Sequence, residues 1–275
     1  MSAAFSPKIS ILIPAFNGAA WIAETLDRVP DAAGGVPYET VVVDNASRDE
    51  TVAICRGKSG VRVLLNEENA GFSRAVNRAA RAATGETLVV INQDLHLEPD
   101  SLKIMAQFLS SNRAVAGGAL TYPNGSEQPS CGPFPTLFGT VWRLALPRRI
   151  RKYDLSASRP KEDRPVDWVT GAFVGFTREL FDLTGGFGED YFMYYEDVDF
   201  CRRAAQAGFP SYFLPQAKAI HVAPFSDRGD APDWLRREVR RSQMTYFRKH
   251  RPGWESGTIR ALNRAYFAAK GWPWP

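Results

Sequence analysis

Short apolar runs alternate with helical patterns over the first 110 residues of the chain. Runs of the length of buried strands stand at 8–13, 40–44, 61–65 and 87–92. The segments between and after them carry helical patterns at 19–29, 47–57, 72–83 and 99–110. Ser47 and Glu50 have the spacing of a capping box, which predicts that the second helix begins there. This alternation predicts an α/β fold with a mostly parallel sheet and helices on both faces.

The pattern changes in the second half of the chain. From 122 to 164 the periodicity is lost and proline, glycine and serine are frequent, so we expect a long surface segment that closes over bound donor. Order resumes at 166–174, and a glycine-rich turn follows at 185–188. Helices are predicted at 198–207 and 234–250, the second of them basic and amphipathic.

Acidic residues stand where two of the predicted strands end. Asp44 and Asp94 close the runs at 40–44 and 87–92, and open α/β sheets bind their ligands at this edge. The acidic group 196–199 and the lone His221 follow later. These side chains suit metal-assisted displacement at a diphosphate ester. They supply oxygen ligands for a hard divalent cation and a separate carboxylate that accepts a proton.

Each of these residues, taken alone, also has a purely structural interpretation. Asp44 fits a solvated strand end, Asp94 fits a cap, and the group 196–199 fits the negative first turn of a helix. His221 and Trp168 are residue types that proteins more often hold in the core than at a ligand. The functional interpretation depends on their occurring together in one ordered set.

That ordered set resembles the family 2 glycosyltransferases. The motifs of the first half stand at 13–17, 43–49 and 69–77. Those of the second half stand at 167–172, 185–187, 194–203 and 219–221. The resemblance covers residues 8 to about 250. Within the family, the chain is similar in particular to the rhamnosyltransferase-like branch, which builds bacterial polysaccharides.

The resemblance implies a GT-A fold, in which a Rossmann-like nucleotide half and an acceptor half share one continuous sheet. The nucleotide half would cover about 1–120 and the acceptor half about 121–230, followed by a helical region at 231–275. The implied reaction is inverting transfer of a sugar from a nucleoside-diphosphate donor, dTDP-rhamnose or a UDP-sugar, to a hydroxyl group. The acceptor would be a glycan or a polyprenyl-diphosphate-linked sugar, and the cofactor a divalent cation, Mg²⁺ or Mn²⁺.

The resemblance also implies roles for individual residues. Asp197 would be the catalytic base, and Asp94 would bind the metal, with His221 reaching the metal or the diphosphate. Trp168, Gly171 and Glu196 would line the acceptor and the donor sugar. The contacts to the nucleotide sugar would come from Pro14, Phe16, Asn17, Asp44, Asn69, Gly71, Phe72, Arg74, Asn92, Gln93 and Asp94.

One motif departs from the family pattern. The usual Asp-x-Asp reads Asn92-Gln93-Asp94 here. An amide accepts a hydrogen bond from a ribose hydroxyl but is a poor metal ligand, so the cation would depend on Asp94, His221, water and the diphosphate. We therefore expect weak metal binding in the absence of donor.

Composition and cysteine use narrow the class of protein. The chain has 275 residues, 44% of them hydrophobic, which is enough for a large core. Its three cysteines are far apart and form no CxxC, so neither a zinc knuckle nor a disulfide framework is indicated. No signal-peptide pattern and no apolar stretch of about 20 residues is visible. We expect a cytoplasmic protein that binds no nucleic acid.

The formal net charge of +4 is unevenly distributed, and two interpretations of the basic segments stay open. The segments 148–152 and 236–251 hold many arginines, and the aromatic residues Trp254, Tyr266, Phe267, Trp272 and Trp274 follow. In one interpretation this region docks peripherally on the anionic inner face of a membrane. In the other the aromatic residues pack on the catalytic domain and the arginines are solvated.

Three other functions compete with sugar transfer. A sugar nucleotidyltransferase would need a glycine-rich basic loop after the first strand, and residues 14–18 do not supply one. A dinucleotide-dependent dehydrogenase is disfavoured because no GxGxxG follows that strand. A catalytically inactive module that binds sugar or lipid is disfavoured by the presence of both Asp94 and Asp197.

Overall fold

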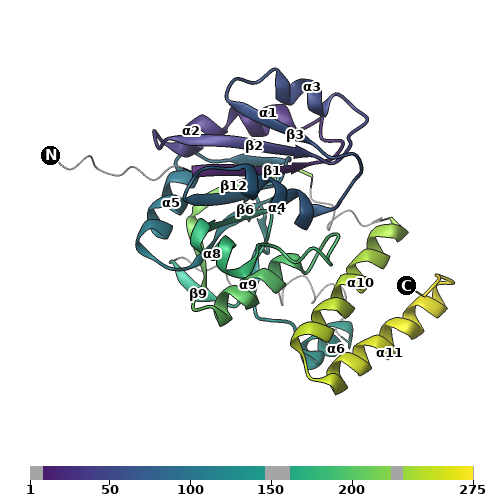
Figure 1. The fold of residues 1–275 in the computed structure, drawn as a ribbon. Coiled ribbons are helices and arrows are strands. Elements are labelled where there is room, and N and C mark those ends of the chain that lie inside the picture. Colours follow the sequence, from purple (N-terminus) through teal and green to yellow (C-terminus); the bar gives the residue numbers. More distant parts are fainter. Residues whose placement is uncertain (1–8, 146–161, 224–231, 275) are drawn as a thin grey trace.

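The computed structural model describes residues 9–145, 162–223 and 232–274. Figure 1 shows a sheet with helices on both sides and a helical hairpin beside it. The first half contains β1 (Ile9–Ala15), α1 (Ile22–Asp27), α2 (Val29–Ala33), β2 (Tyr38–Asp44), α3 (Thr51–Arg56), β3 (Val61–Leu65), α4 (Phe72–Ala82), β4 (Thr87–Ile91), β5 (Leu95–Leu97), α5 (Ser101–Ser111) and β6 (Val115–Thr121). The second half contains β7 (Glu127–Gln128), β8 (Cys131–Gly132), α6 (Leu137–Ala145), β9 (Arg164–Val166), β10 (Trp168–Val169), β11 (Phe173–Thr177), α8 (Arg178–Thr184), α9 (Glu196–Gln206), β12 (Ser211–His221), α10 (Asp233–His250) and α11 (Gly253–Ala269).

One sheet runs through both halves in the order β3-β2-β1-β4-β11-β6-β12-β5. The first four of these strands are parallel, as the sequence predicts. The second half differs from the prediction, because β11 runs antiparallel to both β4 and β6, while β12 is parallel to β6 and antiparallel to β5. Antiparallel insertion of β11 lets the chain return through the middle of the sheet and join the two halves.

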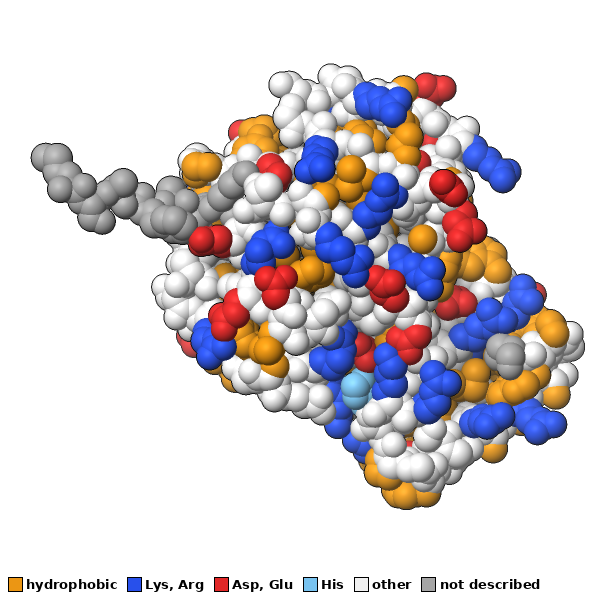
Figure 2. Space-filling view, in the orientation of Figure 1, with side chains coloured by type: hydrophobic (Ala, Val, Ile, Leu, Met, Phe, Trp, Pro, Cys, Tyr) orange, Lys and Arg blue, Asp and Glu red, His pale blue; other side chains and the backbone are white. Residues whose placement is uncertain are grey.

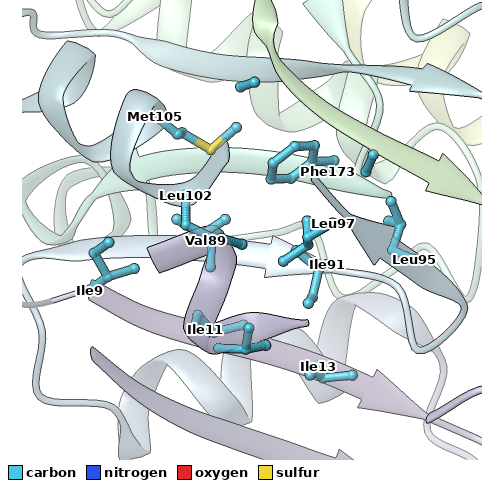
Figure 3. Packing of buried hydrophobic residues seen from close by; sticks show 14 of the residues in the cluster. Ile9, Ile11, Ile13, Val89, Ile91, Leu95, Leu97, Leu102, Met105 and Phe173 are labelled. Carbon is cyan, nitrogen blue, oxygen red and sulfur yellow. The ribbon is translucent and has the colours of Figure 1, made fainter. Parts of the chain in front are cut away.

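Alternating side chains of the strands fill two cores, one on each face of the sheet. Ile11 and Ile13 point to the face covered by α1, α2 and α5, whereas Leu12 points to the face covered by α4, α8 and α9. Figure 3 shows the first core, where Met105 of α5 and Phe173 of β11 meet the side chains of β1 and β4. Apolar burial of about 25 cal/mol per Å² on both faces explains why the strands are continuous apolar runs.

Two of the local predictions are wrong in detail. The helix expected from Ser47 begins instead at Thr51, with no side-chain cap. Ser47 lies in the preceding turn, where its N–H donates to Oδ2 of Asp44 at 2.9 Å. This bond closes a turn between the end of β2 and the start of the helix. The helix expected at 19–29 is two short helices, because the chain turns at Arg28 and Pro30 opens α2.

The described part of the segment 122–164 holds more secondary structure than its composition predicts. Its described part holds the short strands β7 and β8 and the helix α6. Its remaining residues, 146–161, include the basic segment 148–152 and lie outside the described part of the chain. The expected closure of this segment over donor stays a prediction.

The C-terminal helices form a hairpin that is anchored to the catalytic domain (Figure 1). The carboxylate of Asp199 on α9 is fully buried and lies 2.7 Å from Nε2 of His250 and 3.7 Å from Nζ of Lys249. Tyr246 and Phe247 of α10 are buried with Ile259 of α11 in a third core cluster. The hairpin is therefore part of the fold. Within the described residues, no helix combines the length and the apolarity needed to cross a bilayer.

Candidate active site

Asp44 presents a buried oxygen at the C-terminal edge of the parallel strands. It ends β2 in register with Ala15 of β1 and is only 2% exposed. Its Oδ2 accepts the N–H of Ser47, but its Oδ1 has no hydrogen-bond partner among the described residues. A buried carboxylate oxygen without a partner is costly, so it is suited to accept a donor group from a ligand.

The loop after β1 is hydrogen-bonded to the turn that follows Asp44. Asn17 has a positive φ of 47°, its N–H donates to Oγ of Ser47, and its Oδ1 accepts the N–H of Arg48. These bonds fix the loop against the turn after β2, and they occupy part of the polar groups of Asn17. The ring of Phe16 is 43% exposed next to it, available for stacking on a base. Pro14, which was expected to close the strand, lies within β1 and is half-buried, because the strand continues to Ala15.

The loop before α4 joins the two halves of the molecule. The N–H of Phe72 donates to the carbonyl of Phe192 at 2.8 Å, and Oδ1 of Asn69 accepts the N–H of Gly71. Gly71 has a φ of 85°, and a Cβ there would lie 2.5 Å from the Phe192 carbonyl oxygen. Only glycine therefore allows this approach. Arg74, one turn later, is exposed and lies 3.8 Å from a carboxylate oxygen of Glu189.

Asp94 and His221 come together at the end of the sheet, although 127 positions separate them. Oδ1 of Asp94 lies 3.3 Å from Nε2 of His221, and both side chains are buried. Nδ1 of His221 lies 3.1 Å from Oε1 of Gln128 on β7, an acceptor, so the hydrogen belongs on Nδ1. The lone pair of Nε2 then points toward Asp94, the tautomer that a metal ligand needs. Nδ2 of Asn92 also faces Nε2, at 3.3 Å.

Gln93 is directed away from this pair. Its amide accepts the N–H of Phe16 at 3.0 Å and donates to the carbonyl of Phe16 at 3.1 Å. Gln93 therefore fixes the loop after β1. Within the described residues, no group of three or more His, Cys, Asp or Glu side chains is gathered as a metal site would require. A cation would thus need ligands from substrate or water.

Asp197 is held at the start of α9 by two backbone donors. Its Oδ2 accepts the N–H of Gly171 at 3.0 Å and its Oδ1 accepts the N–H of Val198 at 2.8 Å. Burial raises the pKa of Asp197 above the usual range of an aspartate, and these two bonds oppose the shift. Its neighbour Glu196 is 5% exposed and has an Oε2 without a partner in the described structure. Burial, and then the charge of Asp197, raise the pKa of Glu196 well above its usual value.

The backbone that leads into α9 is strained. Tyr194 and Tyr195 have φ values of 68° and 65°, a left-handed conformation that bulky residues rarely adopt. Such strain is kept where the surrounding structure requires it, often at functional sites. Here it immediately precedes the start of α9, where the carboxylate of Asp197 accepts the N–H of Gly171.

Gly171 contacts the candidate base Asp197, whereas Trp168 makes its hydrogen bond elsewhere. A Cβ at Gly171 would lie 3.2 Å from the ring of Phe72 and 3.5 Å from the Cβ of Asp197, so Gly171 is wedged between the two halves. Trp168 is half-buried in the β10–β8 pair, and its indole N–H donates to the carbonyl of Pro133 at 2.9 Å. Its side chain thus links β10 to the segment around Pro133 and packs against the core of the acceptor half.

A family model described as "Glycosyl transferase family 2" matches residues 10–157, more than half of the chain. The chain belongs to this family. Two relatives with functional names agree. The N-acetylglucosaminyl-diphospho-decaprenol L-rhamnosyltransferase of Mycobacterium tuberculosis is 30% identical over 85% of this chain and 82% of its own length. The rhamnosyltransferase WbbL of Escherichia coli is 26% identical over 70% of this chain and 75% of its own length.

Solved structures show the same fold. The mannosyltransferase PcManGT of Pyrobaculum calidifontis, in complex with GDP-Man and Mn²⁺, is similar with a TM-score of 0.62 at 22% identity over 97% of this chain and 76% of that one. TarS of S. aureus, residues 1–349 with UDP, is similar with a TM-score of 0.56 at 19% identity over 95% and 72% of the two chains. The predictions of family 2 membership, of a rhamnosyltransferase-like branch and of a GT-A fold are confirmed.

The sequence missed two residues of this glycosyltransferase that matter to the site. Gln128 orients His221, but it lies in the aperiodic segment, where no pattern marks it. Asp199 was expected only as part of an acidic helix start, yet its partner His250 lies 51 positions later. A buried acid paired with a distant base has no local signal in a sequence.

Proposed function

We propose that this enzyme transfers a sugar from a nucleoside-diphosphate donor to an acceptor hydroxyl with inversion at the anomeric carbon. The observation that carries the proposal is the junction at Gly171 and Ala172. The N–H of Gly171 binds Asp197, and the carbonyl of Ala172 accepts the N–H of Asn92 at 3.0 Å. Two consecutive residues thus place the candidate base next to the strand end that carries Asp94.

The chain's own residues account for the steps of an inverting displacement. The acceptor hydroxyl loses its proton to Asp197 as its oxygen bonds to the anomeric carbon, while the bond from that carbon to the diphosphate breaks on the opposite side. Burial favours this role because a raised pKa makes the ionised Asp197 a stronger base. Oδ1 of Asp44 accepts a hydrogen bond from the nucleobase of the donor, and the ring of Phe16 stacks on that nucleobase. The loop from Asn69 to Arg74 lies along the nucleotide.

We propose that a divalent cation, Mg²⁺ or Mn²⁺, acts with Asp94 and His221. The carboxylate oxygen of Asp94 faces the Nε2 lone pair of His221 at 3.3 Å, an arrangement that a cation or a proton between them would stabilise. When bound, the cation would neutralise charge on the departing nucleoside diphosphate. Asn92 contributes an amide at the same place, where the family's usual motif has an aspartate.

We propose that the donor is dTDP-rhamnose and that the acceptor is a sugar linked to a polyprenyl diphosphate. Both rhamnosyltransferase relatives are named for the transfer of rhamnose, and the name of the Mycobacterium tuberculosis relative contains a diphospho-decaprenol acceptor. This would place the enzyme in the synthesis of a bacterial surface polysaccharide.

A donor screen tests the proposed function. The full-length enzyme is incubated with a farnesyl-diphosphate-linked N-acetylglucosamine and each of dTDP-rhamnose, UDP-glucose, UDP-N-acetylglucosamine and GDP-mannose, with Mn²⁺, Mg²⁺ or chelator. We expect a disaccharide product from dTDP-rhamnose and lower turnover with chelator. In a parallel reaction with added pyrophosphate and no acceptor, formation of a nucleoside triphosphate and a sugar 1-phosphate from the donor would instead indicate a nucleotidyltransferase. Donor binding without product from any donor would indicate an inactive binding module.

We propose further that the enzyme docks on a membrane surface through α6 and the start of α11. Phe138 and Trp142 stack on α6 with ring centroids 6.1 Å apart and are 78% and 54% exposed. The N–H of Leu137 donates to Glu255, so α6 meets the start of α11, where Trp254 is 67% exposed. Figure 2 shows hydrophobic side chains at this lower end of the molecule. Exposed aromatic residues of this kind suit the boundary between water and lipid.

The structure revises which tail residues could take part. Tyr266, Trp272 and Trp274 pack around Phe267 or one another, so these aromatic residues stabilise the hairpin. Arg251 is paired with Glu255, and Lys249 with Asp190. The docking surface is therefore better tested on α6 than by truncation, since loss of α11 would also expose Tyr246 and Phe247 of α10, which are buried in the same cluster as Ile259.

Liposome flotation tests this surface. We expect the wild type to bind vesicles with phosphatidylglycerol more than neutral vesicles, and to release them as salt rises. Phe138→Ser with Trp142→Ser should reduce binding, whereas Leu183→Ser, an equally exposed apolar residue on α8, should not. If the wild type and both variants bind the vesicles equally, or if none of them binds at low salt, the proposal that α6 docks on a membrane is wrong.

A further inference from the structure

A cavity of about 950 Å³ separates the α10–α11 hairpin from the nucleotide half. Asn69, Arg74 and Phe192 line one wall, and the two helices line the other. Ser242 of α10 donates to the carbonyl of Met193 at 2.8 Å, so the cavity lies against the segment that leads into Asp197. Its size is within the range of pockets that hold small organic ligands.

The helical wall is made by one stripe from each helix. The α10 stripe includes Arg241, Thr245 and Arg248, and the α11 stripe includes Gly257 and Arg260. The spacing of three or four residues places each set on one face of its helix. The two stripes form a groove that is open toward the nucleotide half.

Small residues keep this groove open. Gly257 lies inside α11, where glycine costs roughly 1 kcal/mol of helix stability relative to alanine. A Cβ built on Gly257 would meet no atom within 4 Å, so close packing does not explain the glycine. An unfilled space kept at a cost in helix stability is consistent with a bound molecule.

The groove also holds two arginines that the fold does not use. Arg74 and Arg241 have carboxylate neighbours in Glu189 and Glu238. Arg248 and Arg260 have no ion pair or hydrogen bond with any residue that the structure describes, and both are exposed on facing helices. Figure 2 shows Lys and Arg side chains gathered over α10 and α11. Two guanidinium groups on either side of an open groove suit an anion with several oxygens.

We propose that the groove between α10 and α11 binds the diphosphate group of the lipid-linked acceptor, through Arg248 and Arg260. The inference depends on the proposed function, since it assumes an acceptor that carries a diphosphate. The groove borders Phe192, five residues before Asp197, so a sugar attached to the diphosphate could extend toward the base. The exposed aromatic pair on α6 lies beside the start of α11, where the prenyl chain would leave the groove toward the membrane.

Calorimetry on the full-length enzyme tests the site, with farnesyl diphosphate as the probe. The titration is run with a saturating nucleoside diphosphate, so that the donor site is occupied. Arg248→Gln with Arg260→Gln should weaken binding about tenfold or more, because two charge-assisted contacts are lost. Gly257→Leu should weaken it comparably by filling the groove, and it should not destabilise the helix. Arg264→Gln, which removes one positive charge one turn from Arg260 on α11 and outside the groove, should stay within about twofold.

The donor screen and the calorimetry together distinguish failure of the groove as a binding site from failure of the proposed sugar-transferase function. If the donor screen gives product but the groove variants and Arg264→Gln bind farnesyl diphosphate alike, the groove is not the acceptor site, although the enzyme is a sugar transferase. If the groove variants lose only their binding to phosphatidylglycerol vesicles, the groove holds a lipid headgroup and the proposal is wrong. Absence of farnesyl diphosphate binding by the wild type at low salt would also overturn it.

Discussion

The backbone N–H of Gly171 lies 3.0 Å from Oδ2 of Asp197. This contact orients the carboxylate across the junction of the two halves, because Gly171 itself is wedged against Phe72 of the nucleotide half. A base that must meet a hydroxyl in one position benefits from a side chain that cannot rotate. The hydrogen bond also offsets part of the effect of burial on the Asp197 pKa, so the group can still ionise.

Glu196 should be dispensable for the chemistry although it is adjacent to the base. Its buried Oε2 has no partner in the described structure, and burial with the neighbouring charge of Asp197 raises its pKa, which favours its neutral form. Glu196→Gln keeps the shape and the neutral state, and kcat should stay within about threefold of wild type. Steady-state kinetics at neutral pH measures this. A loss of kcat of roughly 10²–10⁴-fold, the range expected for a catalytic base, would indicate that Glu196 rather than Asp197 is the base.

Asp94 should couple metal to donor. Asp94→Ala should weaken nucleotide binding roughly tenfold or more with Mn²⁺ present and much less with chelator, because its carboxylate is then not needed as a ligand. His221→Ala should show a milder form of the same pattern. Asp44→Ala is the matched control, since Asp44 is not assigned to the metal and its carboxylate makes no hydrogen bond or ion pair with Asp94 or His221, so its effect should not depend on metal. Calorimetry that shows equal losses for Asp94→Ala under both conditions would make Asp94 structural.

Gly71 should be intolerant of any side chain. A Cβ at Gly71 would lie 2.5 Å from the Phe192 carbonyl oxygen, at a φ of 85°. Gly71→Ala should therefore weaken the contact between the halves, with a loss of unfolding free energy of about 1–3 kcal/mol and lower kcat/KM. Gly35→Ala is the control, because its φ is 84° but its Cβ would meet nothing within 4 Å. Similar urea midpoints for the two variants would attribute the effect to φ alone.

The parallel half of the sheet was predictable because its strands are buried on both faces, and runs such as 87–92 therefore lack polar interruption. Asp44 and Asp94 were predictable because a strand end fixes where their side chains lie. The antiparallel position of β11 was not, because its run of residues has the same composition in either direction. The pair of Asp94 and His221 and the link from Gln128 depend on strands that meet only after folding.

Asp199 should make the anchoring of the hairpin depend on pH. His250, Arg203 and Lys249 hold the pKa of this buried carboxyl at about 2, against the opposing effect of burial. The folded pKa is thus below the unfolded value near 3.9, so the stabilisation is complete above that value and is lost as the pH falls toward 2. At pH 7 it amounts to about 2 kcal/mol.

Urea unfolding of Asp199→Asn should therefore show a deficit of about 2 kcal/mol at pH 7 that shrinks by pH 3. Asp190→Asn, which removes an exposed partner of Lys249, should cost within about 0.5 kcal/mol at either pH. A deficit that stays constant or grows on acidification would show that the charge of Asp199 does not stabilise the hairpin.

The most direct test of the account is sugar transfer by Asp197→Asn, measured beside the wild type in single-turnover reactions with labelled dTDP-rhamnose and a farnesyl-diphosphate-linked N-acetylglucosamine. The account predicts that the wild type forms the disaccharide and that the variant does so roughly 10²–10⁴-fold more slowly, the usual effect of removing a positioned base. Donor affinity should remain near the wild-type value, because the asparagine can still accept the N–H of Gly171. Transfer by the variant at a near-normal rate would contradict the assignment of Asp197 as the base.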